Sequence, residues 1–141
     1  MKITVVGGGP GGLYLALLTK KARPDWTVEV FEQNQADDTF GFGVVFSDET
    51  LDEFLSRDKP VFERMREELA YWQDVAIHFK GEEIRIGGNG FCGVSRQTLL
   101  TILQERCTQL GVALSFGTTI DPDTITERFA DSDVIVASDG I

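Results

Sequence analysis

The sequence predicts an α/β domain in which strands and helices alternate around a parallel central sheet. A short apolar strand at residues 2–6 runs directly into Gly7-Gly8-Gly9-Pro10-Gly11-Gly12, and a helical pattern follows as far as Lys21. A second apolar strand occupies residues 27–31, and a continuous apolar segment at 133–137 is of the kind that is buried in parallel sheets. A strand, a glycine-rich turn, a helix and a second strand in this order are typical of a Rossmann-like nucleotide-binding unit.

The glycine-rich turn has the spacing Gly-x-Gly-x-x-Gly, with its three glycines at Gly7, Gly9 and Gly12. The first glycine permits a tight turn, the second lets the backbone approach a pyrophosphate, and the third lets the helix pack closely because it has no Cβ. The N-terminus of the helix offers unpaired N–H groups and a partial positive charge. We therefore predict that the diphosphate of an adenine dinucleotide binds at this turn.

Glu32 stands at the carboxyl end of the second strand, about 20 residues beyond the turn, where a Rossmann unit places its ribose-binding acid. Its carboxylate can accept both hydroxyls of an adenosine ribose and would repel a 2′-phosphate, which favours FAD or NAD over NADP. The glycine turn and Glu32 do not distinguish FAD from NAD. An NAD-linked dehydrogenase domain and a non-catalytic nucleotide-binding module are therefore alternatives to an FAD enzyme.

Composition limits the partners and the setting of the chain. A net charge of -10 over 141 residues argues against nucleic acid and against an anionic membrane surface. No apolar segment approaches the roughly 20 residues that span a bilayer. Cys92 and Cys107 form neither a C-x-x-C motif nor a disulfide framework, so we expect buried thiols in a reducing cytoplasm. No metal site is predicted, and His78, the only histidine, is expected to be a surface or core residue.

The middle of the chain departs from the parallel pattern. Gly41 and Gly43 lie among aromatic residues, which suggests backbone passing close to a flat group. Ser47 is a candidate N-cap for a helix over residues 48–56. Pro60 suits the first turn of a further helix, whose apolar face would extend as far as Leu69 and Trp72.

Residues 75–86 alternate with period two and predict an antiparallel β-hairpin. Because a two-stranded ribbon is marginal by itself, we interpret residues 73–94 as an insertion that belongs to a second sheet whose other strands lie outside this chain. Ser95 is then the candidate N-cap of a helix that Gly111 ends, followed by a strand at 112–116 and a short helix at 123–130.

These segments together resemble a known family over the whole chain. The chain resembles the N-terminal part of single-component FAD-dependent aromatic hydroxylases of the para-hydroxybenzoate hydroxylase type. The resemblance rests on Gly7-x-Gly9-x-x-Gly12, Glu32, the segment 95–100 and Ala137-Ser138-Asp139-Gly140. Residues 37–51 are similar to a narrower branch, that of salicylyl-CoA 5-hydroxylase and 2-aminobenzoyl-CoA monooxygenase, to which the flavin hydroxylase of violacein synthesis is related. Such enzymes continue well beyond the Asp-Gly motif, so we expect this chain to be the N-terminal part of a longer enzyme.

The resemblance implies hydroxylation of an activated aromatic ring, either free or CoA-linked, with FAD, with NADH or NADPH as transient reductant and with dioxygen. Arg96 would contact the pyrophosphate or its ribose, and Asp139 would lie near the pyrophosphate and the ribityl chain. No catalytic acid or base is identified, and neither the substrate nor the oligomeric state is predicted. We expect residues 1–141 alone to lack the complete reaction. The cofactor-binding set is Gly7, Gly9, Pro10, Gly11, Gly12, Glu32, Gln33, Gly43, Val44, Arg96, Asp139 and Gly140.

Overall fold

A computed structural model describes residues 1–88 and 90–140 of the chain. The chain divides into two compact units, which are described separately. The first unit contains Met1–Phe40 and the chain from Gln97 onward, and the second contains Gly41–Arg96.

The first unit is built on a parallel sheet with the strand order β8-β2-β1-β9. Its strands are β1 (Lys2–Val6), β2 (Thr27–Phe31), β8 (Ala113–Ser115) and β9 (Val134–Ala137), and its helices are α1 (Pro10–Ala22), α4 (Arg96–Leu110, beginning at the last residue of the second unit) and α5 (Ile125–Arg128). In the middle of β1, Val5 pairs with Val30 of β2 on one side and with Val136 of β9 on the other. The parallel α/β fold predicted from the sequence is confirmed.

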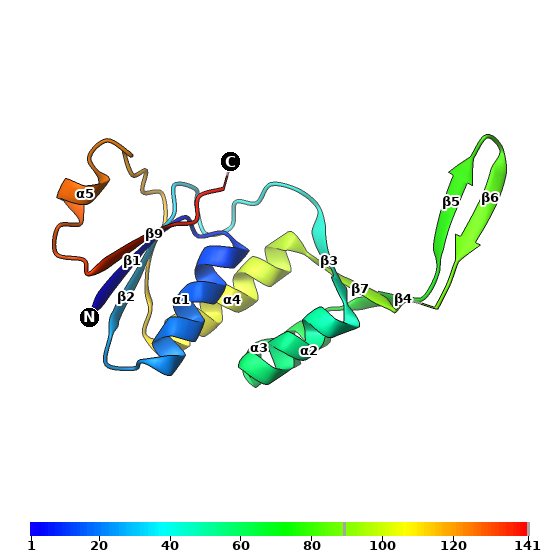
Figure 1. Ribbon diagram of the computed structural model, residues 1–141, viewed down its shortest axis with the longest axis horizontal. Coiled ribbons are helices and arrows are strands. Elements are labelled where there is room, and N and C mark those ends of the chain that lie inside the picture. The colour runs from blue at the N-terminus through cyan, green and yellow to red at the C-terminus, as the bar shows by residue number, and fades with distance from the viewer. Residues whose placement is uncertain (89, 141) are drawn as a thin grey trace. The chain divides into compact units, whose positions relative to one another are not determined.

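Helices α1 and α4 lie side by side on one face of this sheet (Figure 1). Leu13 and Leu17 of α1 are completely buried, as is Cys107 of α4, whose thiol donates a hydrogen bond to the Leu13 carbonyl at 3.3 Å. Burial raises the pKa of the Cys107 thiol to about 12, because the charged thiolate loses its hydration there. Cys92 is also buried with its thiol free, so both cysteines behave as the small core residues that the sequence predicts.

Strand β9 differs from its expected environment. The apolar run predicts a strand buried on both faces, but β9 lies at the edge of the sheet and Val134 is 38% exposed. An apolar sequence indicates that a strand is stable when both of its faces are covered. The described residues include no strand on the far side of β9, so its apolar side chains stay partly exposed.

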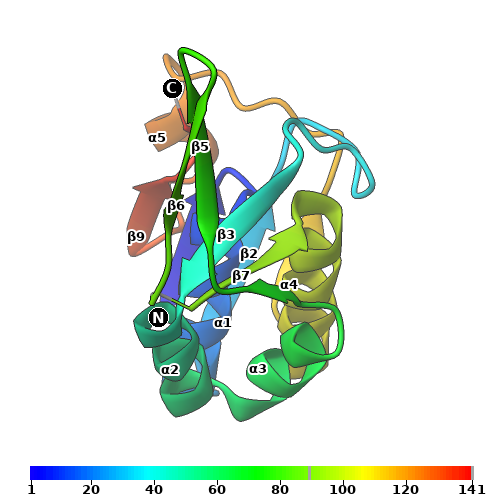
Figure 2. The same ribbon diagram turned by 90° about the vertical axis from the view of Figure 1, so that its right-hand side faces the viewer.

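The second unit contains an antiparallel sheet with the order β3-β7-β4 and a separate hairpin, β5-β6 (Figure 2). Its elements are β3 (Gly43–Ser47), α2 (Asp48–Arg57), α3 (Lys59–Arg66), β4 (Ala70–Trp72), β5 (Val75–Phe79), β6 (Glu82–Ile86) and β7 (Phe91–Ser95). The hairpin turn has positive φ at both Lys80 (52°) and Gly81 (84°), the geometry that matches the twist of two paired strands. Ser47 caps α2, as predicted, by accepting a hydrogen bond from the Thr50 N–H.

Helix α3 is shorter than the sequence pattern predicts. It ends at Arg66, and Trp72 lies instead on β4, where its indole stacks on Phe91 with ring centroids 6.2 Å apart. A Cβ on Gly93 would come within 3.1 Å of the Trp72 ring, so the bare glycine on β7 makes room for the indole. Pairing of β4 with β7 therefore overrides the helical spacing of Leu69 and Trp72.

Asp58 joins α2 to α3 and stabilises the start of α3. The residue is completely buried, and its carboxylate accepts a hydrogen bond from the Val61 N–H at 3.2 Å as the N-cap of α3. We expect Asp58→Ala to lower the free energy of unfolding by about 1–2 kcal/mol and Asp58→Asn to retain most of it, since asparagine caps as well as aspartate. Urea denaturation measures both. Asp52→Ala, which removes an exposed carboxylate of α2, is the control; equal stability of the two alanine variants would contradict the capping role.

Across the described residues, none of the helices combines the length and the apolarity that a bilayer-spanning segment needs.

Candidate functional site

The two crossover directions of the parallel sheet meet at β1. The chain leaves β1 through α1 to β2 and later β8 on one side, and it returns to β9 on the other side. In open α/β sheets such a switch point leaves a crevice at the carboxyl ends of the strands, where ligands bind. Gly7 follows β1 and Ser138 follows β9 at this point, so the glycine turn lies at the crevice.

Gly7 lies where the exits of β1 and β9 come together. Its φ of 108° is a conformation that favours glycine, and a Cβ there would overlap the backbone of Ser138 and Asp139. Hydrogen bonds hold the surrounding backbone: the Gly7 N–H donates to the Phe31 carbonyl at 2.8 Å and the Ser138 N–H donates to the Val6 carbonyl at 2.7 Å. The turn is therefore fixed by both neighbouring strands.

Gly12 and Gly9 differ in their surroundings. A Cβ on Gly12 would strike the Gly7 carbonyl oxygen and come within 2.8 Å of the Ser138 hydroxyl, so the missing side chain lets α1 approach the turn. A Cβ on Gly9 would meet nothing within 4 Å. Gly9 thus borders open space, in the position where the sequence places a pyrophosphate.

Helix α1 begins beside this space without any side chain that competes for its N-terminus. Gly9 is the N-cap and provides no side-chain hydrogen bond, Pro10 follows it, and the first turn contains no acidic residue. The first N–H groups of a helix have no partner within the helix, and they carry its partial positive charge. The N–H groups of Gly11 and Gly12 therefore offer donors to an anion in the crevice.

The Glu32 carboxylate reaches the glycine turn from the end of β2. Its Oε2 accepts a hydrogen bond from the Gly8 N–H at 2.7 Å, and its Oε1 accepts two from Asn34, one from the backbone N–H and one from Nδ2, both at 2.8 Å. A Cβ on Gly8 would come within 2.8 Å of the Glu32 Cβ. Gly8 therefore has to be glycine because of its contact with the Glu32 side chain, and not because of its packing against the helix.

The remaining predicted residues of the first unit lie at the same edge of the sheet. Asp139 and Gly140 follow β9, and the Asp139 N is one of the atoms that a Cβ on Gly7 would strike. Gly140 has a φ of 79°, so the chain turns sharply there. Gln33 follows Glu32 and is exposed.

Three predicted residues belong to the second unit. Gly43 of β3 pairs with Ser95 of β7, Val44 is its neighbour on the same strand, and the Arg96 N–H donates a hydrogen bond to the Phe42 carbonyl at 3.3 Å. The three therefore lie at one end of the β3-β7 pair. A Cβ on Gly43 would come within 2.7 Å of the Val94 carbonyl oxygen, so close strand contact requires this glycine.

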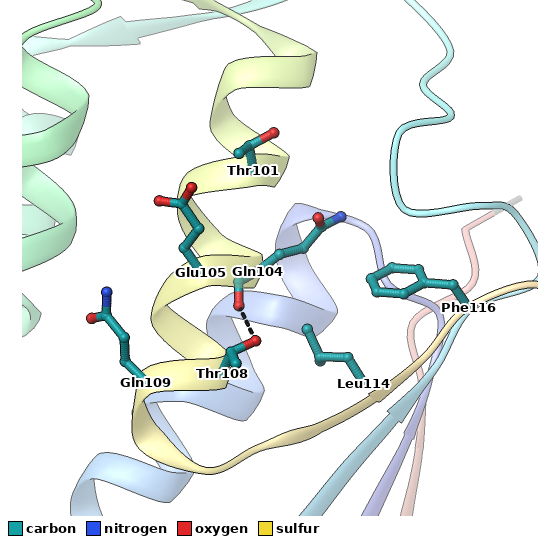
Figure 3. Close-up of a pocket in the computed structure, with 7 residues that line it drawn as sticks. All are labelled: Thr101, Gln104, Glu105, Thr108, Gln109, Leu114 and Phe116. Carbon is teal, nitrogen blue, oxygen red and sulfur yellow. Dashed lines mark hydrogen bonds between the residues drawn. The ribbon is translucent and has the colours of Figure 1, made fainter.

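An open cavity of about 520 Å³ lies elsewhere in the first unit, between α4 and β8 (Figure 3). Leu114 and Phe116 line one side, and the rest of the lining is hydroxyl, amide and carboxylate from α4: Thr101, Gln104, Glu105, Thr108 and Gln109. This lining supplies a carboxylate but no cation for a phosphate, and it includes no residue of the glycine turn. The lining of this cavity therefore does not match a diphosphate, and the glycine turn remains the candidate site.

Three residues of the candidate site are absent from the cofactor-binding set predicted from the sequence: Gly8, Asn34 and Ser138. Gly8 was visible within the glycine run, but its need to be glycine depends on the position of Glu32. Asn34 carries only a weak signal, because asparagine is common in turns for reasons unrelated to ligand binding. Ser138 lies in the Ala137-Ser138-Asp139-Gly140 segment noted in the sequence, but its close approach to Gly7 and Gly12 depends on β9 lying beside β1.

The parallel sheet, its switch point and the close packing of the glycine turn define a Rossmann-type α/β unit. The chain belongs to the family described as lycopene cyclase protein, which matches residues 2–140.

Curated relatives cover nearly the whole chain. It is 45% identical to a salicyloyl-CoA 5-hydroxylase from a Streptomyces species over 99% of its own length and 26% of that protein. It is 28% identical to the 3-hydroxy-4-methyl-anthranilyl-[aryl-carrier protein] 5-monooxygenase of Streptosporangium sibiricum, over 99% of this chain and 38% of that one. It is 30% identical to the protodeoxyviolaceinate monooxygenase of Chromobacterium violaceum, over 100% of this chain and 38% of that one. The resemblance predicted from the sequence is confirmed, and the chain spans between about a quarter and two-fifths of these relatives' lengths.

Solved structures support the same fold. The tetrameric form of 2-methyl-3-hydroxypyridine-5-carboxylic acid oxygenase matches with a TM-score of 0.72 at 20% identity, over 86% of this chain and 33% of that one. The protein FqzB matches with a TM-score of 0.70 at 21% identity, over 86% of this chain and 29% of that one.

Proposed function

We propose that this chain is the FAD-binding part of a flavoprotein monooxygenase that hydroxylates an activated aromatic ring with NADH or NADPH and dioxygen. The observation that carries the proposal is the open space at Gly9, where α1 begins, next to Gly8, whose N–H holds the Glu32 carboxylate. A diphosphate fits the helix terminus and a ribose hydroxyl fits the carboxylate, so an adenine dinucleotide matches both. The three curated relatives are named as a hydroxylase or as monooxygenases, which favours FAD over an NAD-linked dehydrogenase.

The residues of this chain would bind and orient the cofactor. The amides of the turn would hold the diphosphate, Glu32 the adenosine ribose, and the Arg96 guanidinium, planar and matched to phosphate oxygens, a further phosphate or ribose oxygen. Asp139 and Gly140 would lie near the pyrophosphate and the ribityl chain, and Gly43 and Val44 would contribute backbone contacts near the isoalloxazine. Bound FAD would supply the redox chemistry, hydride acceptance and dioxygen activation, that side chains do not provide.

The substrate class that we propose is an aromatic acyl thioester. Two relatives are named for a CoA-linked or a carrier-linked aromatic acid, and both names place the new oxygen at position 5. A hydroxyl or amino group at position 2 of the ring donates electron density to position 5, which is para to it, so an electrophilic oxygen is directed there. A reducing cytoplasm, which keeps Cys92 and Cys107 as thiols, is part of the same proposal.

The hairpin belongs to the proposal as part of a substrate domain. One face of β5-β6 carries five large apolar side chains and one acid, Glu82, which pairs with Phe79 near the turn. Each of the five is at least 39% exposed: Val75, Ile77, Phe79, Ile84 and Ile86. A two-stranded ribbon with an uncovered apolar face is marginal in water. Within the expected insertion of residues 73–94, residues 91–94 belong instead to β7, whose partners β3 and β4 lie in this chain. We propose that the hairpin β5-β6 joins a substrate-domain sheet whose other strands lie outside this chain, and that these five side chains pack within it.

Glu32→Ala tests the proposed site. We expect the free energy of FAD binding to weaken by about 1–3 kcal/mol, because charge-assisted hydrogen bonds to the ribose are lost. Titration of the purified chain with FAD, followed by flavin fluorescence, measures this effect, and a parallel titration with NAD separates the two coenzymes. Glu127→Ala, which removes an exposed carboxylate of the short helix α5, is the control. Unchanged affinity for both coenzymes in Glu32→Ala would refute the ribose role.

A further inference from the structure

Asn34 holds one oxygen of the Glu32 carboxylate with two hydrogen bonds. Its backbone N–H and its Nδ2 both donate to Oε1 at 2.8 Å, while the Gly8 N–H donates to Oε2 at 2.7 Å. The carboxylate is therefore held from two sides, by the turn that follows β2 and by the glycine turn that follows β1.

The segment that carries Asn34 is itself fixed to the strand next to it. The Asn34 carbonyl accepts a hydrogen bond from the Gly117 N–H at 2.9 Å, and the Glu32 backbone carbonyl accepts one from the Thr118 N–H at 2.8 Å. The Glu32 N–H donates in turn to the Ser115 carbonyl at 2.8 Å. These hydrogen bonds fix the backbone of Asn34, so its side-chain amide starts from a fixed position when it bonds the Glu32 carboxylate.

The hydrogen bonds leave the two carboxylate oxygens unequal. An ionised carboxylate has about four acceptor positions, two on each oxygen. Asn34 fills both positions of Oε1, whereas Gly8 fills one of the two on Oε2. One acceptor position remains, and it belongs to the oxygen that lies next to the glycine turn.

We propose that Asn34 is a positioning residue for the adenosine end of the dinucleotide. By saturating Oε1 it leaves Oε2 to accept a single ribose hydroxyl, in place of the two that the sequence alone suggests. The inference rests on the proposed function, because it names how the same site holds its ribose. It adds Asn34 to that site and states that the Glu32 carboxylate accepts one hydrogen bond from the ribose.

The experiment compares ADP with 2′-deoxy-ADP and 3′-deoxy-ADP by NMR titration of the purified chain. With one acceptor position available, one of the two deoxy analogues binds as tightly as ADP and the other about tenfold more weakly, the usual effect of losing one hydrogen bond to a charged group. In Asn34→Ala the second position on Oε1 opens and the carboxylate can rotate, so the difference between the two analogues falls to less than about threefold. A merely structural role of Asn34 would weaken all three ligands equally and preserve the ratio.

Gln104→Ala is the matched control, because the Gln104 amide bonds the same loop through the Ala36 carbonyl at 3.1 Å. It should leave the ratio between the analogues unchanged. Equal losses for both deoxy analogues in the parent chain, or a ratio that survives Asn34→Ala, would overturn the inference. Failure of the proposed function gives a different result, in which Glu32→Ala binds ADP as tightly as the parent. The comparison within the parent chain needs no variant and so does not depend on the folding of any substitution.

Discussion

Gly9→Val is expected to abolish dinucleotide binding while the chain stays folded. Gly9 has φ -69° and ψ 175°, an extended conformation that valine adopts readily, and a Cβ there meets nothing within 4 Å. The branched side chain would occupy the space that we assign to the pyrophosphate. The cost to the fold is small, about 1 kcal/mol from replacing a glycine N-cap by an apolar residue. Titration with FAD measures binding, and a thermal melt of the unliganded chain measures folding.

Gly9→Ala provides a graded control, because a methyl group fills less of the same space and should weaken binding without abolishing it. A valine variant that binds FAD as tightly as the parent would show that the glycine turn is not the site. Loss of binding together with a large fall in melting temperature would contradict the open surroundings that the structure gives Gly9.

Local patterns were sufficient to predict much of the fold. The Ser47 cap, the hairpin within residues 75–86 and the end of α4 at Gly111, which has a φ of 83°, each depend on a few neighbouring residues. The strand β9 was predicted correctly, but its burial and the helical position of Trp72 were predicted wrongly, because both depend on distant strands. The helical spacing of Trp72 gives way to pairing between β4 and β7, and the apolar run of β9 does not reveal that the strand lies at an edge.

The candidate site divides in the same way. The spacing of the glycines and the offset of Glu32 follow from a motif, so the sequence could place them at one edge of the sheet. The inequality of the two Glu32 oxygens could not be predicted, because it depends on the direction of the Asn34 amide and on a hydrogen bond to Gly8 across the two strand ends. The sequence pattern therefore indicates a candidate binding residue, whereas the hydrogen-bond geometry determines how many acceptor positions its carboxylate has left.

Gly12→Ala is expected to destabilise the chain by about 3 kcal/mol, at the upper end of the usual cost of overpacking. The added Cβ would strike the Gly7 carbonyl oxygen and approach the Ser138 hydroxyl to 2.8 Å. Gly7 cannot move away easily, because its N–H is bonded to β2 through the Phe31 carbonyl and its backbone adjoins the exit of β9. Relief of the clash would require α1 to withdraw from the sheet, which exposes the fully buried Leu13 and Leu17.

The neighbouring glycine supplies a control of opposite sign. A Cβ on Gly11 meets only the Ser138 hydroxyl at 3.9 Å, an ordinary contact, and both residues lie in the first turn of α1. Gly11→Ala should therefore raise the free energy of unfolding by up to about 1 kcal/mol, because alanine loses less backbone entropy in a helix than glycine. Urea denaturation followed by tryptophan fluorescence measures both variants. The two variants add the same methyl group at adjacent positions, so opposite effects on stability are expected only if the Gly12 position faces the backbone of Gly7. Equal stability of Gly11→Ala and Gly12→Ala would therefore show that α1 does not pack closely against the glycine turn.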